Sequence, residues 1–236
     1  MKKSKKVLLI SGSSSGLGKD LAKYYIKKNY FVVGCGRKPS GIFSKSYSHT
    51  ILDINDEFKA RKWINEIFLK HKKIDYFINS AAFIPVSYPS LLNDIKLVER
   101  VFKTNVIAQI NLINEVGKKM IKKNFGRIIN FSSMSVGLLE KGTALYSSSK
   151  KSVETYSKIF SKEVIKSNVT CNTIAISMYY SKAFKHINSK IIENSKNQLL
   201  IKRTLKLQEI SNVIDFFFNK ESNVITGQTI YIGLVN

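Results

Sequence analysis

Proline, cysteine and long apolar runs are scarce in this 236-residue sequence, which contains 3 prolines and 2 cysteines. So little proline argues against a disordered linker, and Cys35 and Cys171 lack the spacing of a metal site. The first apolar run ends at Ser11-Gly12, too short for a secretion signal, and no run reaches the roughly 18 residues of a membrane span. We therefore expect a cytoplasmic protein with reduced thiols, no metal and no membrane segment.

Acidic residues are also scarce, because 16 of them stand against 39 lysines and arginines, giving a formal net charge of +23. The lysines are spread along the chain, without a basic helix or the aromatic signature of an RNA-binding module. A solvated, lysine-rich surface is the preferred interpretation, and an anionic substrate is an alternative. Nucleic-acid binding is suggested by the charge alone and is not expected.

Short apolar segments alternate with segments of helical spacing along the whole chain. Strands are expected at Lys5–Ile10, Tyr30–Gly34, Ile51–Leu52, Ile74–Asn79, Arg127–Phe131, Val169–Ile176 and within 225–233. Helices are expected at Leu17–Lys28, Glu57–His71, Leu91–Lys123 with a break in its first third, Leu145–Lys166 and Leu207–Phe218. This pattern predicts one α/β domain over residues 1–236, a Rossmann-like, doubly wound parallel sheet of about seven strands with helices on both faces.

A glycine-spaced loop joins the first expected strand to the first expected helix, with Gly12, Gly16 and Gly18 in it. Glycines let a backbone approach a pyrophosphate, and the unpaired N–H groups at a helix start favour an anion. A glycine pattern alone is weak evidence, but the strand before it and the helix after it favour a dinucleotide site.

Tyr146 and Lys150 are four residues apart, so on a helix they project from one face. A free phenol has a pKa of about 10, and an ammonium a few ångströms away lowers that pKa towards neutrality. The pair is therefore typical of an acid/base site, and Ser133 lies thirteen residues upstream of the tyrosine.

Taken in order, these motifs resemble the short-chain dehydrogenase/reductase family over nearly the whole chain. The segment 11–18 is similar to the family's TGxxxGxG loop, with serine as its first residue, and 53–54 to its adenine-contacting acidic dipeptide. The segment 79–82 is similar to NNAG with two departures, 104–106 to the segment with the helix asparagine, and 126–133 to GRIVNxSS. Tyr146 and Lys150 complete the family's YxxxK motif.

The resemblance implies an oxidoreductase that transfers a hydride between a nicotinamide and a carbonyl or secondary alcohol. The implied catalytic residues are Asn105, Ser133, Tyr146 and Lys150. The implied cofactor-binding residues are Gly12, Ser13, Ser14, Ser15, Gly16, Leu17, Gly18, Arg37, Asp53, Ile54, Asn79, Ala81, Tyr146, Lys150, Tyr179 and Ser181. A non-catalytic, dinucleotide-sensing regulatory protein of the same fold is the alternative, and the four intact catalytic positions argue against it.

Each catalytic residue has a role by resemblance. Tyr146 is the general acid in reduction, Lys150 lowers its pKa and binds the nicotinamide ribose, and Asn105 fixes a water that links the lysine to solvent. Ser133 holds the substrate oxygen; we prefer it to Ser132 because the family spacing fits and because neighbouring residues of a strand face opposite sides.

The cofactor choice depends on the end of the second strand, where NAD-binding relatives carry an aspartate that bonds the ribose 2′-hydroxyl. This sequence has Gly36 there, followed by Arg37-Lys38. A guanidinium matches a phosphate, so NADP(H) is favoured over NAD(H).

After the sixth expected strand, the sequence departs from the family, because the usual Pro-Gly pair is missing from 177–179. Ser181 retains the expected hydroxyl, whereas the lost pair leaves the role of Tyr179 open. The segment 182–200 is expected to be a short substrate lid, with basic residues at Lys182, Lys185, His186, Lys190 and Lys196. Such a lid suits an anionic or carrier-bound carbonyl substrate, as in the similar 3-oxoacyl-[acyl-carrier-protein] reductases and in reductases of cell-surface sugar pathways.

A homotetramer or homodimer is expected through the helices Leu91–Lys123 and Leu145–Lys166, as in most relatives. The second of these helices carries an apolar stripe of Val153, Tyr156, Ile159 and Phe160. The part of the stripe that does not cover the sheet is expected to be exposed unless another subunit covers it.

Overall fold

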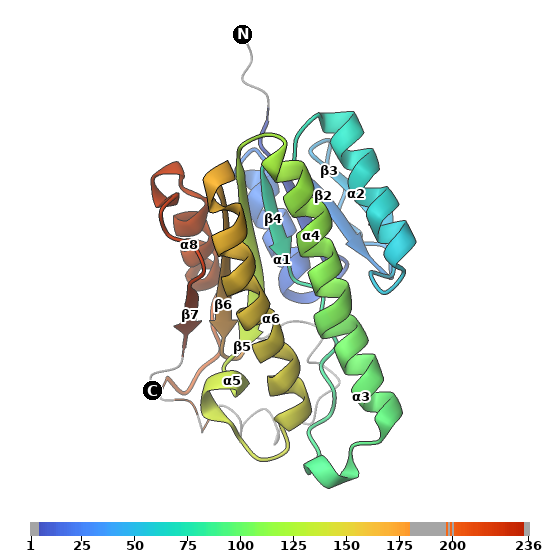
Figure 1. Cartoon of the computed structure of the whole chain (residues 1–236), viewed down its shortest axis with the longest axis vertical. Helices are drawn as coiled ribbons and strands as arrows, with labels where there is room; N and C mark the ends of the chain where they lie inside the picture. The colour runs from blue at the N-terminus through green and yellow to red at the C-terminus, as the bar shows by residue number, and fades with distance from the viewer. Residues whose placement is uncertain (1–4, 180–196, 198, 200, 234–236) are drawn as a thin grey trace.

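The computed structural model describes residues 5–179, 197, 199 and 201–233 and contains one seven-stranded parallel sheet (Figure 1). Its strands are β1 (Val7–Ser11), β2 (Phe31–Gly36), β3 (Tyr47–Ile51), β4 (Tyr76–Asn79), β5 (Gly126–Ser133), β6 (Val169–Ile176) and β7 (Thr229–Ile232). They lie in the order β3-β2-β1-β4-β5-β6-β7. The predicted doubly wound parallel sheet is thereby confirmed.

Helices cover both faces of the sheet (Figure 1). On one face lie α2 (Glu57–His71), α4 (Ala108–Ile121) and α6 (Ala144–Val164), and on the other lie α1 (Gly16–Lys27) and α8 (Leu207–Phe218). Trp63, Leu112 and Phe160 belong to the first core, while Tyr25 and Phe217 belong to the second. Two apolar cores on one buried sheet explain why the inner strands read as continuous apolar runs.

The structure corrects three expected boundaries. The third strand is Tyr47–Ile51 rather than Ile51–Leu52; as an edge strand it is only partly buried and carries polar residues. The segment expected as Leu91–Lys123 contains α3 (Ile95–Phe102) and a π-helical turn (Lys103–Ile107) before α4. The closing strand is limited to β7.

The apolar stripe expected on the second interface helix has the two parts that were predicted, one that covers the sheet and an exposed remainder, and the covered part is the larger. Val153 and Phe160 are buried, and the Tyr156 hydroxyl donates to Asn114 Oδ1 at 2.5 Å. Of the stripe, Ile159 is exposed, at 55%.

Within the part of the chain that the structure describes, no helix has the length and apolarity to cross a bilayer.

The sheet changes direction of winding at β1, because β2 and β3 extend the sheet on one side and β4 to β7 on the other. In such a sheet the loops after the two central strands leave towards opposite faces and open a crevice at their carboxyl ends. The loops after β1 and β4 therefore form the natural place for a ligand.

Candidate active site

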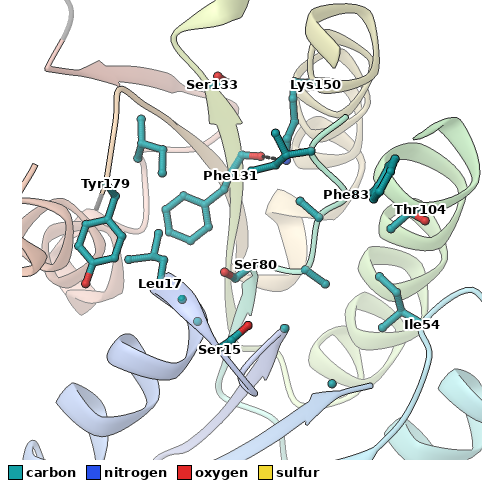
Figure 2. A pocket seen from close by; sticks show the side chains of 18 of the residues that line it. Ser15, Leu17, Ile54, Ser80, Phe83, Thr104, Phe131, Ser133, Lys150 and Tyr179 are labelled. Carbon is teal, nitrogen blue, oxygen red and sulfur yellow. Dashed lines mark hydrogen bonds between the residues drawn. The ribbon is translucent and has the colours of Figure 1, made fainter. Parts of the chain in front are cut away.

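A cavity of about 570 Å³ opens at this crevice, between the loop after β1, the ends of β2, β4 and β5, and the start of α6 (Figure 2). The predicted residues that line it are Gly12, Ser14, Ser15, Gly16, Leu17, Gly18, Arg37, Asp53, Ile54, Ala81, Ser133, Tyr146, Lys150 and Tyr179. The fold thus brings together residues from seven separate stretches of the sequence in one cavity.

The glycine loop packs against the loop after β4 with no room for side chains. Gly12 has φ 74°, and a Cβ there would lie 2.8 Å from Ala81 Cα. A Cβ on Gly18 would collide with the carbonyl oxygen of Gly12. The backbone of this loop therefore faces the cavity directly, at the start of α1.

The hydroxyl of Ser11, which replaces the family's threonine, joins these two loops. It accepts the backbone N–H groups of Ser80 and Ala81 at 3.0 and 3.1 Å and donates to Asn79 Oδ1 at 2.9 Å. Ser11 and Asn79 are both buried, so these bonds are shielded from water. The Ser11 hydroxyl thus adds three hydrogen bonds to the backbone packing that holds the two loops together.

Three predicted site residues do not line the cavity, because their side chains are buried behind its wall. Ser13 lies against the edge strand, where its hydroxyl is 3.1 Å from that of Tyr47. Asn79 donates to Asn130 Oδ1 at 3.1 Å. Asn105 and these two residues thus support the wall. Ser181 lies outside the described residues.

Asn105 belongs to the π-helical turn and is fully buried. Its side chain accepts the N–H of Phe83 and donates to the Phe83 carbonyl oxygen, both at 2.8 Å. A third contact, at 3.2 Å, goes to Ser149 Oγ, next to Lys150. Asn105 therefore couples the loop after β4 to the start of α6. π-Helical turns are often found at functional sites.

Ser132 and Ser133 end β5 and differ in where their side chains point. The hydroxyl of Ser132 is buried and donates to Glu154 Oε1 at 2.5 Å. Ser133 is half-buried, and its Oγ accepts the N–H of Ser135 at 3.2 Å (Figure 2). Ser132 therefore donates its hydroxyl hydrogen to Glu154, whereas Ser133 uses its hydroxyl only as an acceptor in the bonds described and can still donate to a substrate.

Tyr146 and Lys150 face the same cavity from the first turns of α6. The Lys150 ammonium lies 5.7 Å from the centroid of the Tyr146 ring. It donates to the Phe131 carbonyl oxygen at 3.0 Å (Figure 2). Burial lowers the pKa of Lys150 to about 8 and raises that of Tyr146 above its ordinary value. The expectation of a lowered tyrosine pKa is wrong, because desolvation by burial shifts it upward.

The end of β2 is shaped by the absence of a side chain. A Cβ on Gly36 would lie 2.6 Å from Ser14 Oγ, so a larger residue would press on the glycine loop. Arg37 follows, exposed and lining the cavity, whereas no acidic side chain projects from this strand end. Beyond the end of the neighbouring strand β3, the exposed Asp53 also lines the cavity and accepts the N–H of Asn55 at 2.9 Å.

Tyr179, in the segment that lacks the Pro-Gly pair, closes another side of the cavity (Figure 2). Its hydroxyl donates to Asp20 Oδ2 on α1 at 2.9 Å, and its backbone pairs with Leu205 in a parallel bridge. Burial is the main cause that raises the pKa of Tyr179, with the Asp20 carboxylate adding to it. A side-chain bond therefore ties this segment to the helix that starts at the glycine loop.

Sequence reasoning missed several lining residues, including Phe83, Arg100, Thr104 and Phe131. The Arg100 guanidinium lies 4.1 Å from the centroid of the Phe83 ring. Thr104 and Phe131 fall inside motifs that were recognised, whereas nothing in the sequence marked Phe83 or Arg100. Within the described residues, no group of three or more His, Cys, Asp or Glu side chains is placed to hold a metal.

A model of the oxidoreductase family described as enoyl-(acyl carrier protein) reductase matches residues 12–233, from the glycine loop to the end of the described chain. The chain belongs to the short-chain dehydrogenase/reductase family. It is thus an NAD(P)-dependent oxidoreductase, as the order of its motifs predicted.

Relatives of this short-chain dehydrogenase/reductase span its whole length. The 3-oxoacyl-[acyl-carrier-protein] reductase FabG of Buchnera aphidicola subsp. Schizaphis graminum is 28% identical over 238 residues, covering 98% of this chain and 97% of the relative. FabG of Thermotoga maritima is 26% identical over 245 residues, covering 98% of each. Among solved structures, ElxO with NADP bound has a TM-score of 0.90 at 24% identity and covers 97% of each chain. An actinorhodin polyketide ketoreductase with NADPH has a TM-score of 0.85 at 18% identity, covering 97% of this chain and 95% of that one.

Proposed function

We propose that this protein is an NADP(H)-dependent carbonyl reductase in which Tyr146 is the general acid. The observation that carries the proposal is the convergence of Ser133, Tyr146 and Lys150 on one end of a cavity whose other end is bounded by the glycine loop and Arg37. When bound there, the nicotinamide cofactor supplies the hydride.

Tyr146 moves the proton. Burial raises the pKa of its phenol, so at neutral pH the phenol is protonated and ready to donate to a substrate oxygen. In the reverse reaction the same group accepts the proton of the alcohol as a general base.

Ser133 and Lys150 orient the reacting groups. We assign to Ser133 the hydrogen bond that holds the substrate oxygen near Tyr146, because the hydroxyl of Ser132 is already given to Glu154. Lys150 is held by the Phe131 carbonyl oxygen at the base of the site, where its ammonium can reach a cofactor ribose. Asn105 positions the start of α6 through its hydrogen bonds to Phe83 and Ser149. We also assign to it a bound water that links Lys150 to solvent.

The residues present fit NADP(H). At the end of β2, Gly36 leaves space beside Ser14, and Arg37 offers a guanidinium where an aspartate would repel a phosphate. ElxO and the actinorhodin ketoreductase, which share the fold, are described with NADP and NADPH. We infer that Arg37 pairs with the cofactor's 2′-phosphate.

The substrate is a carbonyl compound, and we propose an anionic or carrier-bound one. The similar proteins of Buchnera aphidicola and Thermotoga maritima are named as 3-oxoacyl-[acyl-carrier-protein] reductases. Arg100 adds a second exposed cation to the lining of the cavity, beside Phe83. The lysines and His186 of the expected lid lie outside the described residues.

We also propose a homotetramer or homodimer through the outer faces of α4 and α6, which lie side by side (Figure 1). The support is a set of exposed isoleucines at this surface: Ile107 at 64%, Ile121 at 42% and Ile159 at 55%. Sedimentation at moderate salt and micromolar concentration tests the assembly; a monomer of 26.8 kDa alone would refute it and leave the catalytic assignments untouched.

The experiment that tests the function is a substrate panel followed by NADPH absorbance, with 3-oxoacyl thioesters, simple ketones and nucleotide-linked keto sugars. Turnover of at least one class by the wild-type protein, lost in Tyr146→Phe, supports the reductase. Tight NADPH binding without turnover of any class would instead favour the non-catalytic, dinucleotide-sensing protein. Tyr156→Phe is the matched control, because it removes a hydroxyl from the same helix outside the cavity.

A further inference from the structure

The edge strand β3 carries two side chains, Tyr47 and His49, that reach back to the glycine loop without lining the cavity. The Tyr47 hydroxyl lies 2.9 Å from His49 Nδ1 and 3.1 Å from Ser13 Oγ. On the other side of the ring, His49 Nε2 lies 2.9 Å from the Lys38 carbonyl oxygen. The four groups form one continuous chain of hydrogen bonds between two segments that are 25 residues apart in sequence.

The Lys38 carbonyl oxygen, at one end of this chain of hydrogen bonds, determines the direction of the bonds that follow. A carbonyl oxygen can only accept, so Nε2 of His49 donates to Lys38. In the neutral imidazole, Nδ1 then accepts from the Tyr47 hydroxyl, whose oxygen in turn accepts from Ser13. The Ser13 hydroxyl also lies 3.4 Å from the Cys35 carbonyl oxygen and 3.4 Å from His49 Nδ1, so the Tyr47 hydroxyl is its nearest partner among three. Removing His49 leaves the Lys38 carbonyl oxygen without this donor and the Tyr47 hydroxyl without its nearest acceptor.

Gly34 on β2 makes room for the contact. A Cβ at this position would lie 2.5 Å from the Tyr47 hydroxyl and would collide with Ser13 Oγ. Gly34 pairs with His49 in the sheet, and both Gly34 and Ser13 are buried. A glycine inside a strand weakens it, so its presence here is explained by the close approach of these two hydroxyl groups.

The two ends of the chain are the two sides of one subsite. Ser13 precedes Ser14, which lines the cavity and faces Gly36. Lys38 follows Arg37, which lines the cavity opposite. Gly36 lies between these two segments, because a Cβ there would meet Ser14 and because Arg37 follows it in sequence. The hydrogen-bonded chain therefore connects the residue before Ser14 to the residue after Arg37.

We propose that Tyr47 and His49 are positioning residues that set the width of the cofactor's 2′-phosphate subsite and thereby its preference for NADPH over NADH. Neither residue touches the cofactor; they act through the backbone at Ser13 and Lys38. This inference rests on the proposed use of NADP(H). It predicts that their loss affects the cofactor with the phosphate much more than the cofactor without it.

Equilibrium titration of NADPH and NADH by fluorescence tests the proposal in wild type, His49→Ala, His49→Gln and Tyr47→Phe. His49→Ala should weaken NADPH about three- to tenfold and leave NADH within twofold, because one hydrogen-bonded anchor of the Arg37 segment is lost. Gln places an amide N–H about where Nε2 lies, so His49→Gln should restore much of the preference. Tyr47→Phe keeps the ring and removes the central hydroxyl, and should lower the preference by a smaller factor.

The control is His71→Ala, which removes a half-buried histidine from the end of α2, packed on Phe31 outside the cavity. It should leave both affinities unchanged, whereas thermal melting of every variant reports any general loss of stability. If His49→Ala weakens both cofactors equally, or changes neither, the positioning role is overturned. If the wild-type protein does not prefer NADPH, the proposed use of NADP(H) is wrong. The wild-type titration shows this before any variant is compared, so the two failures can be told apart.

Discussion

Two parts of the cavity wall are held in different ways. The glycine loop is held by backbone against backbone, at Gly12 and Gly18, and by the Ser11 hydroxyl. Among the described residues of the segment after β6, Tyr179 donates to Asp20 and bridges to Leu205, and backbone bonds join Ser177 to Ile232 and Met178 to Leu205. The first part keeps the family's motifs nearly intact, whereas the second has lost the Pro-Gly pair.

The difference shows which features of the site tolerate change. A wall built from backbone leaves little freedom, because any Cβ at Gly12 or Gly18 meets another main chain. A wall anchored by a side chain, such as Tyr179 on Asp20, leaves the backbone there less restricted. We therefore expect substitutions within the recognised motifs to reduce activity or cofactor affinity strongly. Substitutions in the segment after β6 should change these quantities only slightly.

The largest effect is expected at Tyr146. Tyr146→Phe removes the proton donor and little volume, so kcat should fall about 10²- to 10⁴-fold while the Kd for NADPH changes little. Steady-state kinetics and a fluorescence titration measure the two quantities. Activity within tenfold of wild type would sink the assignment of this tyrosine as the general acid.

Lys150 is expected to show a combined effect. Lys150→Met should lower kcat about 10²-fold and also weaken cofactor binding, because one side chain is assigned to both tasks. Lys158→Met, on the exposed side of the same helix, is the control and should change neither. A loss of stability with unaltered kcat and Kd would make Lys150 a structural residue.

The same lysine gives a pH dependence of stability in the ligand-free protein. Burial lowers its pKa from 10.5 to about 8, so between these two pH values the unfolded chain binds more protons at this site than the folded one. The contribution of Lys150 to the free energy of unfolding should therefore rise as pH increases from about 8 to about 10.5. Urea denaturation of wild type and Lys150→Met across this range measures it, and parallel curves would contradict the buried, deprotonating lysine.

Arg37→Ala should have an intermediate effect, on one cofactor. A charged hydrogen bond to phosphate is worth roughly 1.5 to 3 kcal/mol, so the Kd for NADPH should rise about ten- to a hundredfold while that for NADH stays constant. Arg61→Ala, an exposed arginine paired with Glu57 on α2, is the control. Equal wild-type affinities for the two cofactors would refute the preference.

The fold was largely predictable, because most inner strands are apolar on both faces and alternate with amphipathic helices. The edge strand β3 was misplaced, since Tyr47, His49 and their neighbours carry no such signal. At the site, motif order located the loops correctly but could not tell that Ser14 faces the cavity and Ser13 faces away. That difference depends on contacts with Tyr47, 34 residues further along the chain, which a local pattern does not contain.

The smallest effect is expected at Tyr179, and it decides whether the two walls differ as described. Tyr179→Phe keeps the ring in the cavity wall and removes the bond to Asp20, so the Kd for NADPH should rise only about two- to tenfold, with kcat nearly unchanged. Tyr24→Phe is a matched control: it removes a hydroxyl bond of 2.7 Å to Asp215 from the same helix α1, outside the cavity. Each variant removes one hydrogen bond from a tyrosine to a carboxylate on or against α1, although Asp215 keeps Tyr25 and Lys28 as donors. A thermal melt reports the stability that each variant loses, and only Tyr179→Phe should affect NADPH. A loss of activity as large as that of Tyr146→Phe would show that the segment after β6 is as restricted as the glycine loop, and that one hydroxyl there has taken over the task of the missing Pro-Gly backbone.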